Sequence, residues 1–203
     1  MEHFFAIILF AISASITPGP NNIMVMTSGA NFGAKRTLPL LTGICIGFTL
    51  MLLLVGLGFS TLFEQFPSLH LIIKCVGVAY LLYLAWLIAH SQQGVEQDEK
   101  GKPLSFIKGA LFQWVNAKAW IVATGAIAAF TSGSEKFLPQ VMTIAGTFFV
   151  VSFPCVAVWL LFGSMLQRAL TTTESRKRFN VAMSLLLVVS VFPVAREVIE
   201  TLL

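Results

Sequence analysis

Six long runs of apolar residues, separated by short polar segments, account for most of the chain. The runs lie at about 4–27, 38–60, 69–90, 106–130, 139–166 and 179–201. A helix needs about 20 apolar residues to cross the hydrocarbon core of a bilayer, and each run reaches that length. The pattern therefore predicts an all-α integral membrane protein with six transmembrane helices, in a single transmembrane domain that occupies residues 1–203.

Basic residues border the runs unevenly, and this predicts how the helices are oriented. The first, third and fifth connections and their flanks hold Lys35, Arg36, Lys100, Lys102, Lys108, Arg168, Arg176, Lys177 and Arg178. The amino terminus, the other connections and the carboxyl terminus hold only Lys136 and Arg196, and Lys74 and Lys118 lie within runs. Cytoplasmic loops carry the excess of Lys and Arg, so both termini are expected in the periplasm.

This topology gives the first three and the last three predicted helices opposite orientations. Two inverted three-helix halves are a recurring plan of transporters, in which the substrate binds near the middle of the membrane where the halves meet. The sequence predicts this plan from topology alone, because the two halves resemble each other only weakly in sequence.

Composition narrows the function classes. The chain is 57% hydrophobic and 11% charged, whereas soluble domains are about 25% charged. The net charge is +4, and the basic residues lie mostly at the ends of the runs. This distribution does not indicate a nucleic-acid-binding surface. Since no Asp or Glu lies deep in a run, neither a hydrolytic triad nor a carboxylate proton relay is expected. Nothing indicates a cofactor, a metal site or an enzyme.

The first run contains the strongest local feature, a break made of Thr17, Pro18, Gly19, Pro20, Asn21 and Asn22. Two prolines remove backbone donors, and such a break is tolerated in a membrane only against protein or water. The new helix start offers free N–H groups and a dipole that favour a carboxylate. The asparagines could bind the rest of a zwitterion. The simpler alternative is a proline kink packed against neighbouring helices.

The fourth run contains Gln113, Asn116 and Lys118. Lys118 lies about 18 Å into this run at 1.5 Å per residue, where a lysine is costly and usually functional. It could bind substrate, carry a proton, or only make a cation–π contact with Trp114. On an ideal helix Lys118 points about 160° away from Asn116. We take all nine residues of the two segments as the candidate substrate site.

These motifs resemble the LysE/RhtB amino-acid exporters, which are small six-helix proteins of the bacterial inner membrane. The resemblance rests on the motifs Thr17–Asn21, Gly43 with Gly47, Gly77–Leu81, Phe106 with Gly109, and Asn116–Ala119. The family usually has proline where this chain has Ala117, which predicts a less broken helix over 106–130. The paired asparagines and this substitution are most similar to the branch that exports cysteine and O-acetylserine.

The resemblance implies a secondary exporter of small neutral amino acids, driven by an ion gradient, in the bacterial inner membrane. Its partners would be the amino acid and the lipid bilayer, with no nucleic acid; a homo-oligomer is compatible with the sequence. Efflux of homoserine or threonine within the same family is one alternative. A membrane thiol–disulfide carrier is another, and would need two of the cysteines Cys45, Cys75 and Cys155 to meet. A third alternative is a subunit that scaffolds other membrane proteins and transports nothing itself. A metal-ion exporter is disfavoured because the runs lack the carboxylate or histidine ligands that metal sites usually need.

Overall fold

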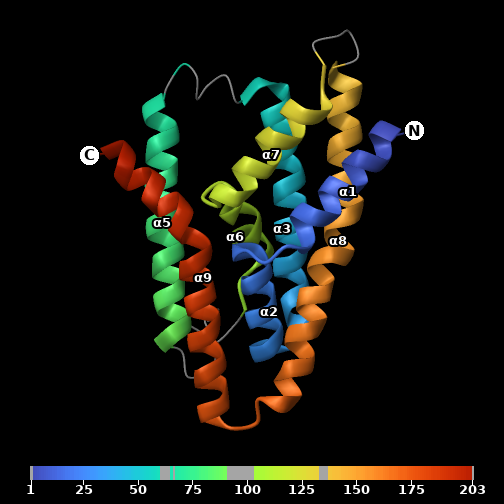
Figure 1. Ribbon diagram of the computed structural model, residues 1–203. Helices are drawn as coiled ribbons and strands as arrows, with labels where there is room; N and C mark the ends of the chain where they lie inside the picture. Colours follow the sequence, from blue (N-terminus) through green and yellow to red (C-terminus); the bar gives the residue numbers. More distant parts are fainter. Residues whose placement is uncertain (1, 60–64, 66, 91–102, 133–136, 203) are drawn as a thin grey trace.

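The computed structural model describes residues 2–59, 65, 67–90, 103–132 and 137–202, and all its regular elements are helical. They form a bundle of long helices (Figure 1). In chain order they are α1 (Glu2–Ile16), α2 (Pro20–Phe32), α3 (Ala34–Leu54), the π-helical turn η1 (Val55–Phe59), α5 (Pro67–His90), α6 (Phe106–Phe112), α7 (Ala117–Phe130), α8 (Phe137–Ala169) and α9 (Thr173–Leu202).

Several of these helices can cross a membrane by length and composition. Among the described residues, the stretches Ala34–Gly58, Phe137–Ala169 and Thr173–Thr201 do so individually. His3–Ile16 and Pro20–Phe32 do so together, as a pair bent by 54°. Cys75–His90 and Ala117–Phe130 are apolar but shorter. The protein is therefore an all-helical membrane protein with three individual candidate spans, or four with the bent pair.

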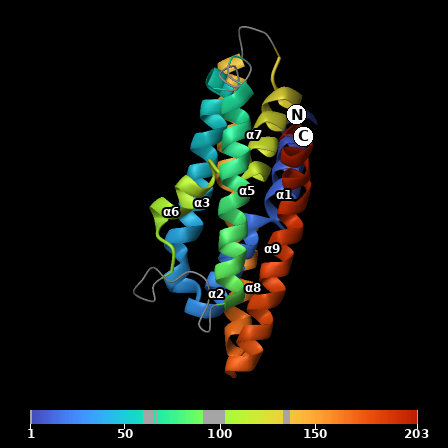
Figure 2. The ribbon, with the colours of Figure 1, turned by 90° about the vertical axis from the view of Figure 1, so that its left-hand side faces the viewer.

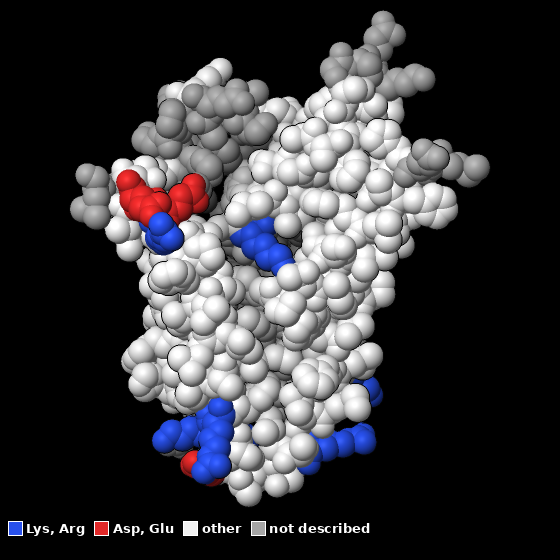
Figure 3. All heavy atoms as spheres, viewed as in Figure 1, with Lys and Arg blue, Asp and Glu red and all other residues white. Residues whose placement is uncertain are grey.

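The outer surface of the bundle is apolar. Leu9, Ile121 and Met165 are 65%, 63% and 71% exposed, respectively. An apolar surface of this extent is unfavourable in water and favourable in lipid. Figure 3 shows basic side chains at the lower end of the molecule, a mixed acidic and basic group at its left-hand side, and one basic side chain in a hollow about halfway along the face.

The two ends of the bundle differ in their charged residues. Both termini lie at one end, and the α2–α3 turn and the α8–α9 connection lie at the other (Figure 1). Lys35 and Arg36 lie in the first turn of α3, and Arg168 lies in the last turn of α8, at the end away from the termini. Arg196 lies in the half of α9 nearer the termini and pairs with Glu200 at 2.7 Å. Lys100, Lys102, Lys136 and the side chain of Lys74 fall outside the described part.

Both broken runs are visible as pairs of helices. The first continues past its break to Phe32, rather than ending near residue 27. The expectation that Ala117 would leave the fourth helix less broken is wrong, since α6 ends at Phe112 and α7 begins at Ala117. Asn116 makes this break with an extended backbone (φ −87°, ψ 100°), and Ala117 follows as the first residue of α7. Alanine has the highest helix propensity and can begin α7 in place of proline, so the break does not depend on proline.

Two apolar clusters fill the bundle. The cluster nearer the termini includes Ile7, Phe48, Met51, Ala123 and Phe148. The other includes Met26, Leu40, Ile44, Leu84 and Leu160. Both broken segments lie at the level where these clusters meet. Beside them, α5 and α9 form a pair in both views (Figures 1 and 2), joined by a 2.7 Å bond from Ser184 Oγ to the Ala85 carbonyl.

Glycines allow backbone contact between α3 and α6 and between α2 and α8. Such a close approach is what Gly43 and Gly47 lead one to expect for α3. A Cβ at Gly43 would lie 2.1 Å from the Phe106 carbonyl oxygen on α6. A Cβ at Gly163 on α8 would lie 2.1 Å from the Met26 carbonyl oxygen on α2. Gly33 instead supplies a positive φ of 80°, which lets α2 turn directly into α3. These contacts fix α2 and α6 against the long helices α8 and α3.

Candidate functional site

The break between α1 and α2 leaves backbone carbonyls at the end of α1, and side chains bind most of them. Asn22 Nδ2 donates to the carbonyls of Ser15 (2.8 Å) and Thr17 (2.9 Å). Trp159 Nε1 on α8 donates to the carbonyl of Ile16 at 3.0 Å. A helix end inside a membrane needs such partners, because no water is present to supply them.

The start of α2 is different, because its donors face an open space. Gly19 is the N-cap residue and has no side chain to bind the first N–H groups. Pro20 follows at the first helical position, where its missing N–H is no loss. The structure gives no hydrogen-bond partner to the N–H groups of Asn21 and Asn22 among the described residues. The positive end of the α2 dipole is therefore available to a ligand.

The two broken helices are joined by an amide pair. Asn21 Nδ2 donates to Gln113 Oε1 at 2.9 Å, and Gln113 Nε2 donates to Asn21 Oδ1 at 3.1 Å. Gln113 Nε2 also donates to the Gly109 carbonyl at 3.1 Å, and the Gln113 side chain is fully buried. Gln113 thus fixes the start of α2 to the end of α6.

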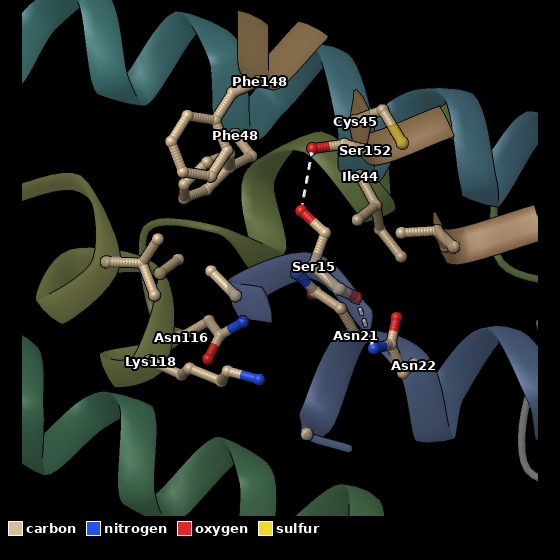
Figure 4. A pocket seen from close by; sticks show the side chains of 15 residues that line it. Ser15, Asn21, Asn22, Ile44, Cys45, Phe48, Asn116, Lys118, Phe148 and Ser152 are labelled. Atoms are coloured by element: carbon tan, nitrogen blue, oxygen red, sulfur yellow. Dashed lines mark hydrogen bonds between the residues drawn. The ribbon is translucent and has the colours of Figure 1, made fainter. Parts of the chain in front are cut away.

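Lys118 lies in the first turn of α7 and reaches across to the other break. Its Nζ donates to the carbonyl of Thr17 at 3.0 Å and to that of Pro18 at 3.5 Å. The expected orientation away from Asn116 is wrong, because Asn116 is extended and both residues face the break (Figure 4). Trp114, the cation–π partner of Lys118 in one of the alternatives, packs edge-on against Trp120 at a centroid distance of 5.8 Å.

Two cavities border the breaks. The first cavity holds about 490 Å³ of empty space, including its open mouth, and lies between α1, α2, α3, α7 and α8. Ser15 and Ser152, whose Oγ atoms are 3.3 Å apart, lie on one side of it, and the rings of Phe48 and Phe148 close another (Figure 4). The second cavity holds about 740 Å³ of empty space, again including its open mouth, and lies between the breaks and the α5–α9 pair.

Two amide oxygens at the first cavity have no partner. Asn22 and Asn116 both line it, and their side chains are 3% and 1% exposed. Neither Oδ1 atom has a hydrogen-bond partner in the described part of the protein. A buried acceptor without a partner costs about 1–3 kcal/mol, so these oxygens favour the entry of a donor.

The structure places the nine predicted residues at or beside the two breaks, but they differ in which cavity they line. Gly19, Asn116 and Lys118 line both cavities; Asn21 and Asn22 line only the first, and Pro18 and Pro20 only the second. Thr17 contributes its carbonyl, and Gln113 lies behind Asn21 and lines neither cavity. Sequence reasoning missed Ser15, Ser152, Phe48, Phe148 and Cys45 of the first cavity, since nothing in their local pattern differs from ordinary membrane helices.

Known proteins match this chain along most of its length. A family model for LysE type translocators covers residues 12–196. The chain belongs to the LysE-type translocator family. The translocator is 29% identical to the cysteine/O-acetylserine efflux proteins of Escherichia coli K12 and Shigella sonnei, over 88% of this chain and 90% of theirs. No solved structure matches it. The predicted resemblance to LysE/RhtB amino-acid exporters is confirmed, and both relatives are efflux proteins by name.

Proposed function

We propose that this translocator exports small neutral amino acids, cysteine or O-acetylserine first among them, across the bacterial inner membrane. An ion gradient drives the export, and the substrate binds in the first cavity between the two broken helices. The family and the names of the relatives support amino-acid efflux as the activity. The observation that carries the site is the pair of buried, unpartnered amide oxygens of Asn22 and Asn116 beside this cavity.

The charges around the cavity suit both ends of a zwitterion. The starts of α2 and α7 both border it, so two helix N-termini offer positive potential to a carboxylate. The oxygens of Asn22 and Asn116 accept hydrogen bonds from an ammonium group. The serines and phenylalanines beyond them leave room for a short side chain that is weakly polar.

The membrane topology of this proposal has six spans, with both termini in the periplasm. The three long candidate spans and the bent pair α1–α2 make four. Helix α5, with 24 residues, makes the fifth, and the broken pair α6–α7 makes the sixth. The basic residues gathered at the end away from the termini support a cytoplasmic location for that end.

Efflux from proteoliposomes tests the function. Vesicles containing the purified full-length protein are loaded with labelled cysteine, O-acetylserine, serine, threonine or lysine, and an ion gradient is imposed. We expect saturable efflux of at least one small neutral amino acid. In Asn116→Ala the loss of one hydrogen bond to a charged group, worth about 1.5–3 kcal/mol, raises the substrate concentration for half-maximal efflux roughly 10- to 100-fold.

Asn31→Ala is the matched control, because Asn31 also has a buried, unpartnered Oδ1 but lines neither cavity. It should leave the concentration dependence unchanged. Asn116→Ala should not lower the thermal stability, since within the described residues the Asn116 side chain caps no N–H group and its oxygen has no hydrogen-bond partner. Equal effects of the two substitutions on efflux would reject this site, and no efflux of any of the five amino acids would reject the function.

A further inference from the structure

We propose that Lys118 is a latch between the two cavities, and that an amino-acid substrate opens it by exchanging ionic partners with it. The inference rests on the proposed function, and it adds a role for Lys118 and a requirement that the substrate carry both an ammonium and a carboxylate group. The substrate passes from one cavity to the other only after this exchange.

The position of Lys118 makes it part of the wall between the cavities. Lys118, Gly19 and Asn116 line both cavities, so they lie between them. A Cβ at residue 19 would lie 3.0 Å from Lys118 Cδ and 3.1 Å from its Nζ. The lysine side chain therefore lies directly against the Gly19 backbone, and the glycine leaves it the room to do so.

The electrostatic environment holds Lys118 at this place only weakly. It is the second residue of α7, at the positive end of that helix dipole, where a cation is unfavourable. Its described partners are the carbonyls of Thr17 and Pro18, at the negative end of α1. None of the described residues that line either cavity is acidic. An ammonium group whose partners are all neutral readily exchanges them for a carboxylate, because the charge-assisted hydrogen bond is stronger.

The substrate supplies both halves of the exchange. Its carboxylate binds the ammonium of Lys118 near the start of α2, and its own ammonium then moves from the oxygens of Asn22 and Asn116 to the Thr17 and Pro18 carbonyls that Lys118 leaves. Each positive group keeps an oxygen partner, and the net charge of the site does not change. Because Lys118 leaves the Gly19 backbone, the wall between the cavities opens at that point.

Binding measurements on the purified full-length protein test the exchange. The ligands are cysteine and cysteamine, which is the same molecule without its carboxylate, and both are titrated calorimetrically under reducing conditions. We expect the wild type to prefer cysteine by roughly 10- to 100-fold, the contribution of a charge-assisted bond. In Lys118→Met, which keeps most of the length of the side chain without its charge, the ratio of the two affinities should fall by about tenfold, to what the two helix N-termini contribute.

Lys35→Met is the matched control, since Lys35 is exposed at the start of α3 and lines neither cavity. It should keep the wild-type ratio. A cysteine preference in Lys118→Met that equals the wild-type preference overturns the exchange and leaves the proposed function standing. If the wild type binds neither cysteine nor any other amino acid of the efflux assay, the proposed function and the exchange are both wrong.

Alkylation of Cys45, which lines the first cavity, tests the latch without a substrate. In a Cys75→Ala/Cys155→Ala background, Lys118→Met should accelerate alkylation about tenfold, because one charge-assisted bond no longer holds the wall closed. The same background with Lys35→Met should react at the original rate. An unchanged rate in Lys118→Met would show that Lys118 does not close the passage.

Discussion

Substitution of Gly43 by alanine should separate α3 from α6 and destabilise the protein. The new Cβ would lie 2.1 Å from the Phe106 carbonyl oxygen, 2.8 Å from its carbonyl carbon and 2.9 Å from its Cα. All three are backbone atoms, so no side-chain rotation can relieve the contact. Carbon atoms pack at about 3.5–4.0 Å, and α6 must therefore move by roughly 1 Å or more.

The cost follows from this displacement and from what alanine gains. Overpacking in a well-packed interior costs about 1–3 kcal/mol, and the upper part of that range applies because Gly47 and Gly109 hold the same two helices at the same spacing. Alanine recovers up to about 1 kcal/mol of helix propensity. The net loss is about 2 kcal/mol, or roughly 4–8 °C in melting temperature for a chain of this size.

Gly146→Ala on α8 is the control, since a Cβ there would have no described atom within 4 Å. It should melt at or slightly above the wild-type temperature. The assay is thermal unfolding in detergent, followed by the fraction of protein that stays monodisperse after heating, with both variants in parallel. A free-energy difference of 1 kcal/mol would shift the melting temperature by about 2 °C or more. If Gly43→Ala and Gly146→Ala melt within about 2 °C of each other, the backbone contact at Gly43 does not limit stability.

Two further predictions concern the topology and the cysteines. In a cysteine-free background, a membrane-impermeant thiol reagent applied to intact cells should label Glu200→Cys but not Lys177→Cys; the reverse result would invert the proposed orientation. Replacement of Cys75 and Cys155 by alanine leaves only Cys45, so that no two cysteines of the chain can form a disulfide, and neither of the replaced residues lines either cavity. This variant should keep efflux at the wild-type level, because amide oxygens, helix ends and Lys118 form the proposed site. Loss of efflux in a protein that remains folded would instead favour the thiol–disulfide carrier.

The features that the sequence predicted well depend on local rules. The apolar runs reflect the thickness of the bilayer, which every spanning helix must match. The first break is visible because Pro18, Gly19 and Pro20 remove donors and helix propensity within three residues. The close contact at Gly43 could be expected because only glycine allows two helix backbones to approach so closely.

The second break was underestimated because distant contacts stabilise it. No residue from Gln113 to Asn116 forbids a helix, and Ala117 favours one. The extended Asn116 is accompanied by the bond from Trp120 Nε1 to the Trp114 carbonyl at 2.9 Å and by the amide pair that joins Gln113 to Asn21. Tertiary contacts of this kind override helix propensity, and they also bring Lys118 and Asn116 to the same cavity.

Side chains separated along the chain were beyond prediction for a related reason. Ser15 and Ser152 meet across 137 residues. Hydroxyl groups in membrane helices commonly bind their own backbone, as Thr147 does with the Thr143 carbonyl at 2.8 Å. Nothing in the sequence distinguishes a hydroxyl group that lines a cavity from one that binds its own helix.

The way in which the site holds its charge bears on which amino acids it can export. Its one described cation, Lys118, is balanced by the partial charges of the α1 carbonyls rather than by a carboxylate. In the proposed exchange a zwitterion adds one charge of each sign, and each charge meets an opposite partner at the breaks. An amino acid with a cationic side chain adds a second positive charge among Ile44, Phe48 and Phe148, where nothing in the described lining balances it. Because an unpaired charge in an apolar cavity costs several kcal/mol, lysine should be exported far more slowly than the neutral amino acids in the same vesicles.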